Sequence, residues 1–356
     1  MRFIDRSILF INLGVIAATF LAYAAPLVDP QLTWIISFFG LFYPILLILN
    51  VVFIIFWAVR KPKYSIPSII CILMGINALK GFVSLNGSGP EAEGLSIRMI
   101  TYNISNANYG MERKMKNKEE KQKQFSAFLK EYAETDIFCF QEVGDFSYQI
   151  IKKVFADRHL YYKNKGAVIV SKHPFTEKGE IDFGTITNSC LWADVDLGDE
   201  TVRVYSFHLQ SNQITRDAEK LANQSDIDQK QAWYDVKAIL RKFRNKHLTR
   251  SNQAEKIEAH ASKSPHKVIL AGDLNDPPQS YTYRVISSLG KDAFREKGMG
   301  IGTTYAGRIP LLRIDYIIVD NALQVMDYHM INNRFSDHNA ISSTISWPVE
   351  GDAGEE

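Results

Sequence analysis

Polar side chains that can bind a metal or a phosphoryl oxygen recur where apolar, strand-like segments of this sequence end. Any one of them has a simple explanation, because Asn and Asp favour turns. Six such places between residues 103 and 338 are harder to explain that way, since strand ends at one edge of a sheet converge in space. They are Asn103, Gln141-Glu142, His208, Asp273-Leu274-Asn275, Asp315 and Ser336-Asp337-His338.

The chemistry that suits this set is metal-assisted attack on phosphorus. Hard carboxylate oxygens such as those of Glu142 favour Mg²⁺ or Mn²⁺ over Zn²⁺, which prefers nitrogen and sulfur. Such a cation polarises a phosphoryl oxygen and stabilises the charge on the leaving group. A water nucleophile also needs a base, for which we expect His338, with Asp315 behind it to fix its tautomer. The side chains expected to donate to or orient the phosphate are Asn103, Asn275 and His208.

The segments that carry these residues alternate between strand and helix patterns from about residue 95 onward. Apolar patterns of period two, or short apolar runs, predict strands at 97–103, 136–142, 166–171, 189–197, 201–209, 267–273, 313–319 and 340–346. Helical patterns occupy roughly 216–246, 252–262 and 280–289. This alternation over residues 95–347 favours a layered α/β domain with buried sheets. The acidic residues 348–356 are expected to form a disordered tail.

The ordered set of motifs resembles the endonuclease/exonuclease/phosphatase superfamily, which includes pancreatic-type deoxyribonucleases, exonuclease III-like repair enzymes, neutral sphingomyelinases and inositol polyphosphate 5-phosphatases. The similarity covers roughly residues 95–347, and its specificity lies in the order and spacing of six motifs. These are Tyr102-Asn103, Phe140-Gln141-Glu142, Phe207-His208-Leu209, Ala271-Gly272-Asp273-Leu274-Asn275, Arg313-Ile314-Asp315 and Ser336-Asp337-His338.

The resemblance implies a four-layer αββα sandwich of two mixed sheets and a catalytic cation, Mg²⁺ or Mn²⁺. It implies Glu142 as the main metal ligand, assisted by Asn103 and Asp337. It further implies that Asp273 and Asn275 orient the nucleophile or protonate the leaving group. It also implies that His338 is the general base, supported by Asp315, and that His208 stabilises the transition state.

Two details separate this chain from some members of the superfamily. Several nucleases carry an Asp two residues after the first-strand Asn, and Ser105 stands at that place here. The segment His208-Leu209-Gln210 is more similar to the sphingomyelinase and general phosphodiesterase branches than to the repair nucleases. Neither detail fixes a substrate.

The first 86 residues have the composition of a membrane anchor. Three apolar segments, 8–28, 34–59 and 66–85, approach or exceed the roughly 20 residues that a helix needs to cross a bilayer. The third is weaker, because it contains Asn77 and Lys80. We expect three spans; the alternatives are two spans with a re-entrant or interfacial third segment, or a cleaved signal peptide for the first segment.

The loops around these segments predict their orientation. Arg2 and Arg6 precede the first segment, and Arg60, Lys61 and Lys63 lie between the second and the third. Because positive charge stays on the cytoplasmic side, the chain is predicted to be multi-pass in the inner membrane with its catalytic domain outside the cytoplasm, after a flexible linker at 87–94.

The charge distribution argues against duplex DNA as a partner recognised by bulk electrostatics. Residues 1–86 hold six Lys/Arg and two Asp/Glu, which leaves 35 of the 41 basic and 37 of the 39 acidic side chains for the remainder. A near-neutral domain lacks the basic face that duplex binding favours.

Three functions stay open at this point. The first is a phosphodiesterase or nuclease, and the second is a lipid-directed phosphodiesterase or phosphatase of the sphingomyelinase or inositol-phosphatase type. The third is an inactive, membrane-bound binding module. The predicted partners are a phosphoester substrate, either nucleic acid or a phospholipid or small phosphodiester, and the membrane itself; the sequence identifies no protein partner.

Overall fold

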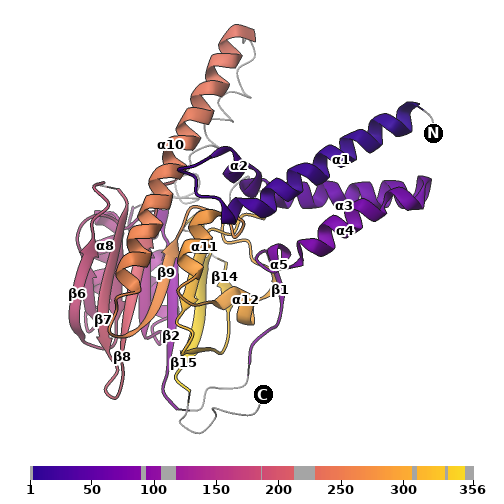
Figure 1. Cartoon of the computed structure of the whole chain (residues 1–356). Helices are drawn as coiled ribbons and strands as arrows, with labels where there is room; N and C mark the ends of the chain where they lie inside the picture. Colours follow the sequence, from indigo (N-terminus) through magenta and orange to yellow (C-terminus); the bar gives the residue numbers. More distant parts are fainter. Residues whose placement is uncertain are drawn as a thin grey trace.

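The computed structural model describes residues 3–89, 94–105, 118–185, 187–211, 229–306, 311–332 and 336–348. Figure 1 shows two parts: a bundle of N-terminal helices that projects to one side, and a layered sandwich of sheets and helices. The chain passes from the bundle into the sandwich at strand β1 (Val83–Leu85), which pairs with β11 (Met299–Ile301).

One sheet of the sandwich has six strands within the described residues, in the order β10-β12-β9-β8-β7-β6. Strands β8 and β9 run parallel, and the other neighbours are antiparallel. The carboxyl ends of β8 and β9 therefore meet at one edge of the sheet. The strands are β6 (Phe175–Ile181), β7 (Ser189–Asp196), β8 (Thr201–His208), β9 (Lys267–Asp273), β10 (Lys291–Asp292) and β12 (Asp315–Val319).

The second sheet joins the first strand of the sandwich to the last. Its order is β13-β15-β2-β3-β5-β4, and β14 pairs with β15. Strands β2 and β3 are parallel, so their carboxyl ends also share an edge. The strands are β2 (Ser96–Asn103), β3 (Ile137–Gln141), β4 (His159–Tyr162), β5 (Val168–Ser171), β13 (Gln324–Val325), β14 (His329–Ile331) and β15 (Ala340–Ser346).

Helices cover both outer faces of the paired sheets. An apolar cluster that includes Met99 and Val204 fills the space between the sheets. A second cluster packs the outer face of the six-stranded sheet against α10 (Gln229–Ala261) and α11 (Tyr281–Ser287). A third packs the other outer face against α7 (Lys118–Glu131) and α8 (Asp145–Val154). Because both faces of each sheet are covered, strands such as β3 read as continuous apolar runs. The predicted αββα sandwich of two mixed sheets is confirmed.

The N-terminal part is helical, but its boundaries differ from the predicted ones. The predicted segment 34–59 is interrupted at Phe42, because Pro44 lies in the first turn of α3 and lacks the N–H that a continuous helix needs. The helices are α1 (Phe3–Ala24), η1 (Ala25–Leu27), α2 (Ile35–Leu41), α3 (Tyr43–Arg60), η2 (Pro62–Tyr64), α4 (Ile66–Met74) and α5 (Ile76–Leu79).

The prediction of a single helix over 66–85 is wrong. α4 ends before Gly75, where a Cβ atom would lie only 2.0 Å from the Tyr23 hydroxyl, so this close approach requires glycine. Helix α5 ends at Leu79, and residues 83–85 form β1 on the sandwich. Residues Phe3–Leu27 and Tyr43–Arg60 are long and apolar enough to cross a membrane, whereas the apolar helix Pro62–Met74 is shorter. By length and composition alone, such helices are compatible with membrane spans or with a signal sequence.

Two further predicted boundaries can be compared with the structure. The helical patterns predicted at 216–246 and 252–262 form one helix, α10, over 229–261, while residues 212–228 lie outside the described part. In the predicted linker 87–94, the backbone N–H of Gly89 donates to Met326 O at 2.7 Å, so this residue lies against the sandwich. The rest of the linker at 90–93 and the acidic tail from 349 onward lie outside the described residues.

Candidate functional site

The predicted site residues lie at strand ends that the two sheets bring together. His208 and Asp273 are the last residues of the parallel strands β8 and β9 and pair in register. Asp315 begins β12 directly opposite Asp273. Gly272 allows this close approach of strands, because a Cβ atom there would lie 2.1 Å from Phe207 O and the residue has a φ of 155°. From the second sheet, Asn103 ends β2 and reaches the same place.

Asp273 occupies the centre of the cluster. Its carboxylate accepts hydrogen bonds from Asn103 Nδ2 at 2.9 Å, from the Asn275 backbone N–H at 2.7 Å and from Asn275 Nδ2 at 3.2 Å. The carboxyl group is completely buried, and this burial, together with the nearby Asp315, raises its pKa to about 6. Histidines 338 and 208 and Asn103 oppose that shift.

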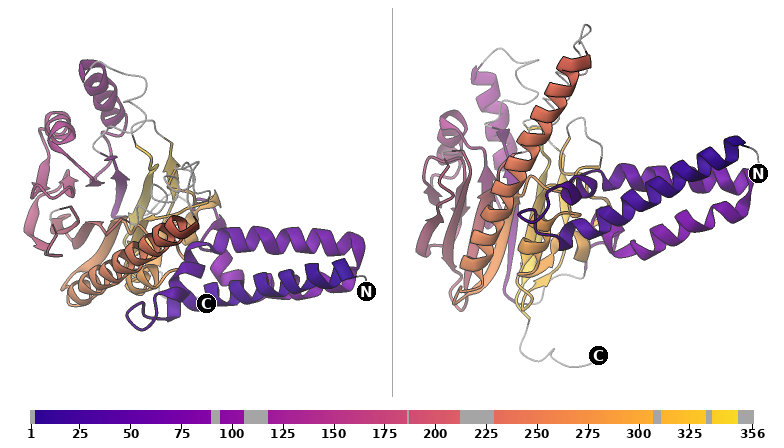
Figure 2. Two further views of the ribbon diagram at one scale, coloured as in Figure 1. Left: turned by 90° about the horizontal axis from the view of Figure 1, so that it is seen from above. Right: turned by 45° about the horizontal axis from the view of Figure 1, so that its top comes forward.

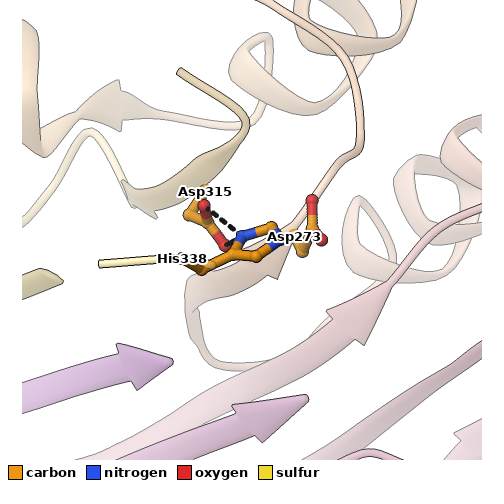
Figure 3. Close-up of side chains that lie close together, drawn as sticks. All are labelled: Asp273, Asp315 and His338. Atoms are coloured by element: carbon orange, nitrogen blue, oxygen red, sulfur yellow. Dashed lines mark hydrogen bonds and ion pairs between the residues drawn. The ribbon is translucent and has the colours of Figure 1, made fainter. Parts of the chain in front are cut away.

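His338 and Asp315 form a buried pair beside Asp273, as Figure 3 shows. His338 Nδ1 lies 2.9 and 3.1 Å from the two Asp315 oxygens, and its Nε2 faces Asp273 Oδ2 at 3.8 Å. Burial disfavours a charged ring, but Asp315 and Asp273 outweigh it and raise the pKa of His338 to about 10. Thr304 Oγ1 holds this edge in place by accepting the backbone N–H of Asp315 at 3.1 Å.

Glu142 is the accessible acid of the cluster. It follows β3 in a left-handed conformation with φ of 52°, which is uncommon for a residue with a side chain and turns it out of the strand. Its side chain is 40% exposed, and its Oε1 lies 3.2 Å from Asn103 Nδ2 and 3.4 Å from His208 Nε2. Gln141, in contrast, is buried, and its Nε2 donates to Thr101 Oγ1 on the neighbouring strand and to Ser206 Oγ of the other sheet, so its role is structural.

Asp337 completes the set of predicted residues at this edge. Burial raises its pKa, as do the charges of Glu142 and Asp315, while His338 opposes the shift. The preceding Ser336 donates from Oγ to Asn103 O at 2.6 Å, which ties this segment to the end of β2. All eight predicted site residues therefore lie in one neighbourhood, at the carboxyl ends of β2, β3, β8 and β9 and the adjoining segments.

Comparison with known proteins identifies the family. A sequence model described as "Endonuclease/Exonuclease/phosphatase family" matches residues 100–338. The chain belongs to this family. A model described as "Domain of unknown function (DUF8431)" matches residues 5–82, which is the helical bundle. No curated protein sequence matches the chain.

Solved structures of endonuclease/exonuclease/phosphatase family proteins share the fold of the sandwich. A humanized D. rerio TDP2 is 17% identical with a TM-score of 0.53, over 70% of this chain and 99% of that one. A family protein from Bacteroides thetaiotaomicron is 15% identical with a TM-score of 0.53, over 72% and 100%. D. rerio TDP2 in complex with a single-strand DNA product is 17% identical with a TM-score of 0.51, over 71% and 100%.

Members of the endonuclease/exonuclease/phosphatase family are metal-dependent phosphoester hydrolases, and the side chains of this cluster fit a hard cation. Ligand atoms of Asp273, Asp315 and His338 lie within 4.8 Å of one another and are buried. Glu142 and Asp337 add two further carboxylates at the same edge. Crowded carboxylates that raise one another's pKa are relieved by a cation, and an oxygen-rich donor set suits Mg²⁺ or Mn²⁺.

Within this cluster Glu142 is a better candidate for a metal ligand than the buried trio. Asp315 is already engaged by His338, whereas the Glu142 side chain is 40% exposed and can reach an incoming cation. His208 also supports a ligand site beside Glu142: both of its ring nitrogens are buried and make no hydrogen bond within the described part of the chain. Its Nε2 lies 3.4 Å from Glu142, where a phosphoryl oxygen or a ligand of the cation can satisfy it.

A buried network behind the site was missed from the sequence. Arg250 of α10 is fully buried and donates to Gln210 O at 2.7 Å and to the Asp276 carboxylate at 3.0 Å. Gln253 Oε1 accepts the Gln210 backbone N–H at 2.8 Å. These bonds fix the segments that follow His208 and Asn275. The only sequence signal is the spacing of Arg250 and Gln253, which puts them on one face of a helix.

Proposed function

We propose that this protein is a membrane-anchored hydrolase of phosphoesters that uses Mg²⁺ or Mn²⁺ and a His338-activated water. The observation that carries the proposal is the Asp273-centred cluster, in which side chains from four strand ends of two sheets face one another. Turns at strand ends do not require four carboxylates and two histidines at one edge, whereas phosphoryl transfer to water needs such a set.

The proposed reaction assigns one task to each side chain. His338 accepts the proton of the attacking water at Nε2, because Nδ1 faces Asp315. Asp273 and Asn275 orient that water or the leaving oxygen. The groups that donate to the phosphoryl oxygens are Asn103 and His208.

A divalent cation held by Glu142, with Asn103 and Asp337 assisting, would polarise a phosphoryl oxygen and stabilise charge on the leaving group. Without a cation, Asp315 and Asp273 raise the pKa of His338 to about 10, which favours a protonated ring. Positive charge held at Glu142 would lower this pKa because like charges repel, and would leave Nε2 able to accept the proton of the water.

The anchor is proposed because the N-terminal bundle is polar inside and apolar outside. Asn12 Nδ2 donates to Ser68 Oγ at 2.8 Å, and Trp57 Nε1 donates to Asn12 Oδ1 at 3.1 Å. Asn50 Nδ2 donates to Thr19 Oγ1 at 2.9 Å. In water a helix buries its apolar face, whereas in lipid small and polar side chains join helices together. A cleaved signal sequence has no need of interhelical hydrogen bonds.

We further propose three crossings, with the catalytic domain outside the cytoplasm. Helices α1, α3 and α4 run side by side, with the sandwich at one end and the N-terminus at the other (Figures 1 and 2). At that far end Asp5 pairs with Arg60 at 2.7 Å and Lys61 at 3.0 Å. Since this end holds the basic residues, the positive-inside rule favours the cytoplasm for it.

The test uses the full chain in nanodiscs with a generic phosphodiester, bis(p-nitrophenyl) phosphate. We expect hydrolysis with Mg²⁺ or Mn²⁺ and none with a chelator. Glu142→Ala and His338→Ala should each lower the rate by at least about a hundredfold. The exposed residues Glu177 and His329 provide matched controls, and Glu177→Ala and His329→Ala should leave the rate unchanged. Equal rates in all four variants would reject the assignment, as would an inactive wild type that binds neither cation.

A lipid-borne phosphoester is a second candidate substrate, favoured by the position of the site next to the anchor. Leu41 of α2 packs with Leu312 and Ile314, and Tyr305 joins this cluster. The Tyr305 ring also lies 5.3 Å from the His338 ring. The base of the anchor thus touches the rim of the site. For comparison, D. rerio TDP2 has been crystallised with a single-strand DNA product.

A substrate panel separates the two candidates. Sphingomyelin-like lipids, inositol phosphates, and single- and double-stranded DNA are offered to the same nanodisc preparation. Hydrolysis confined to the lipids or inositol phosphates supports the lipid-directed function, and hydrolysis confined to nucleic acid rejects it.

A further inference from the structure

The N-terminal half of α10, residues 229–246, is a basic amphipathic helix that the catalytic site does not use; we call it the α10 arm. It contains six Lys/Arg and one Asp. Trp233, Val236, Leu240 and Phe243 recur at spacings of three and four, which places them in one stripe along the helix. The exposed basic side chains that flank or oppose this stripe are Lys237, Arg241, Lys242 and Arg244.

The inner end of the apolar stripe contacts the base of the helical bundle. Phe243, its inner member, lies 6.0 Å from Trp34 and 5.7 Å from Phe38, measured between ring centroids. Figures 1 and 2 show that the arm extends past the ends of the two sheets, with α2 beside the middle of α10. Members of the stripe beyond Phe243 therefore point toward the same side of the molecule as the anchor.

Exposed apolar side chains occur both on the arm and at the base of the bundle. Trp233 and Tyr234 of the arm are 58% and 59% exposed. At the base of the bundle Leu32 is 83%, Leu27 67% and Ile35 55% exposed. In the catalytic part of the chain such exposure is otherwise confined, among the described residues, to Met299 and Ile301. Tryptophan and tyrosine rings favour the level of the lipid headgroups.

We infer that the α10 arm is a membrane-contact surface that binds anionic lipid headgroups. A helix with Trp, Leu and Phe on one face and Lys and Arg on the other lies in the plane of a bilayer surface, and its basic side chains attract anionic lipids. The inference rests on the anchored state in the proposed function, because the anchor brings the arm to the surface. It adds an orientation: the end of the sandwich that carries the site is held against the bilayer.

The charge of the arm favours lipid over nucleic acid. The rest of the catalytic part has nearly equal numbers of basic and acidic side chains, so its bulk charge does not favour nucleic acid. A bilayer surface needs only a basic amphipathic helix, because the apolar stripe can enter the interface while the flanking cations stay at the headgroups.

The test places an environment-sensitive dye on the arm of the full chain in nanodiscs. Val236→Cys carries the dye on the stripe, and Ala238→Cys, at an exposed position about 200° around the helix, carries it as a control. The native cysteines, Cys71, Cys139 and Cys190, are buried. We expect the emission at position 236 to shift to the blue in nanodiscs with anionic lipid but not in purely zwitterionic ones. High salt should reduce the shift, because it screens the attraction.

A charge-reversal variant makes the test specific. Lys237→Glu/Arg241→Glu/Arg244→Glu should abolish the blue shift. The matched variant Lys130→Glu/Lys152→Glu/Lys153→Glu alters three exposed lysines on α7 and α8 and should keep it. A shift that is equal in both nanodisc types overturns the inference. So does a shift that appears only with single-stranded DNA, or only when discs carry two copies of the chain.

The outcome is separable from that of the proposed function. Hydrolysis of soluble bis(p-nitrophenyl) phosphate should be unchanged by the charge reversal, since these side chains lie outside the site. If the wild type hydrolyses nothing, the proposed function fails while the dye shift still decides the role of the arm.

Discussion

The helical bundle and the sandwich of this protein are built from opposite arrangements of the same residue types. Of the 28 large hydrophobic side chains that are exposed among the described residues, 24 lie within residues 3–85 and only four in the sandwich. The bundle instead buries Asp5, Asn12 and Asn50. In the sandwich apolar side chains fill the layers between sheets and helices. The difference supports the proposal that the bundle lies in lipid and the sandwich in water.

Buried polar residues consequently have different tasks in the two regions. In the bundle they would join helices that have no hydrophobic reason to associate in the proposed lipid environment. In the sandwich they are concentrated at the edge that carries the candidate site and in charge pairs that fasten loops, such as Arg250 with Asp276.

The largest expected effect is at the contact between the bundle and the sandwich. Arg313 is buried, donates to Gly81 O at 2.9 Å and pairs with the buried Asp292 through two bonds, at 2.6 and 3.0 Å. Arg313→Met leaves Asp292 without its cation and should destabilise the protein by about 3–5 kcal/mol. Chemical unfolding in nanodiscs measures this. The double variant with Asp292→Asn should recover part of the lost stability. An unchanged unfolding midpoint in Arg313→Met would show that the contact between the bundle and the sandwich does not depend on this pair.

A matched pair of lysine substitutions tests the solvent of each region. Val52 in the middle of α3 is 53% exposed and Ile301 in β11 is 52% exposed. Val52→Lys should cost about 2.5–3.5 kcal/mol if that face contacts lipid. Ile301→Lys should stay within about 0.5 kcal/mol, as surface substitutions in water usually do. The inserted fraction in carbonate-washed membranes reports the first value and thermal unfolding the second. Similar small effects at both positions would refute the lipid-facing assignment.

Acid should weaken the network behind the site through His247. Burial lowers the pKa of His247 to about 4, and Arg250 acts in the same direction, while Asp276 opposes it. The unfolded chain binds this proton more readily, so the stability contribution is present above about pH 6.5 and is lost as the pH falls toward 4. His247→Gln should remove up to roughly 3 kcal/mol of that pH dependence. Unfolding midpoints at pH 7 and 4.5 measure it, and identical slopes in both proteins would contradict it.

The smallest expected effect concerns positioning without contact to substrate. Arg250→Lys keeps the charge but cannot reproduce the bonds to Gln210 O and Asp276 together. We expect kcat to fall about ten- to a hundredfold with little change in KM, because small displacements of catalytic groups are costly. Arg98→Lys, at an exposed arginine of β2, is the control. A change confined to KM would place Arg250 in substrate binding instead.

The site was largely predictable from the sequence because its residues lie where strands end. Asn103, His208 and Asp273 close predicted strands, and parallel neighbours bring such ends together. The Arg250 network was not predictable, since its partners, Gln210 and Asp276, are 40 and 26 residues away and nothing local marks them. Only packing of α10 on the sheet creates that contact.

The fold was predictable in the layers of the sandwich and less so in the N-terminal bundle. Period-two patterns located the long strands, but short strands such as β1 carry too few residues to show a period. The segment 66–85 is apolar throughout, and composition does not distinguish a buried strand from a helix, so its last residues were assigned to a span. Pairing of β1 with β11, which only the tertiary structure provides, decides against it.

The most direct test is where the phosphoester hydrolase activity resides in cells that express the full chain. Membranes are washed with alkaline carbonate, and hydrolysis of bis(p-nitrophenyl) phosphate with Mg²⁺ is measured in the pellet and in the supernatant, with Glu142→Ala expression as the background. We predict activity in the pellet, released only by detergent, on a chain whose intact mass retains residues 1–86. Activity in the supernatant on a chain shortened at its N-terminus would contradict the account.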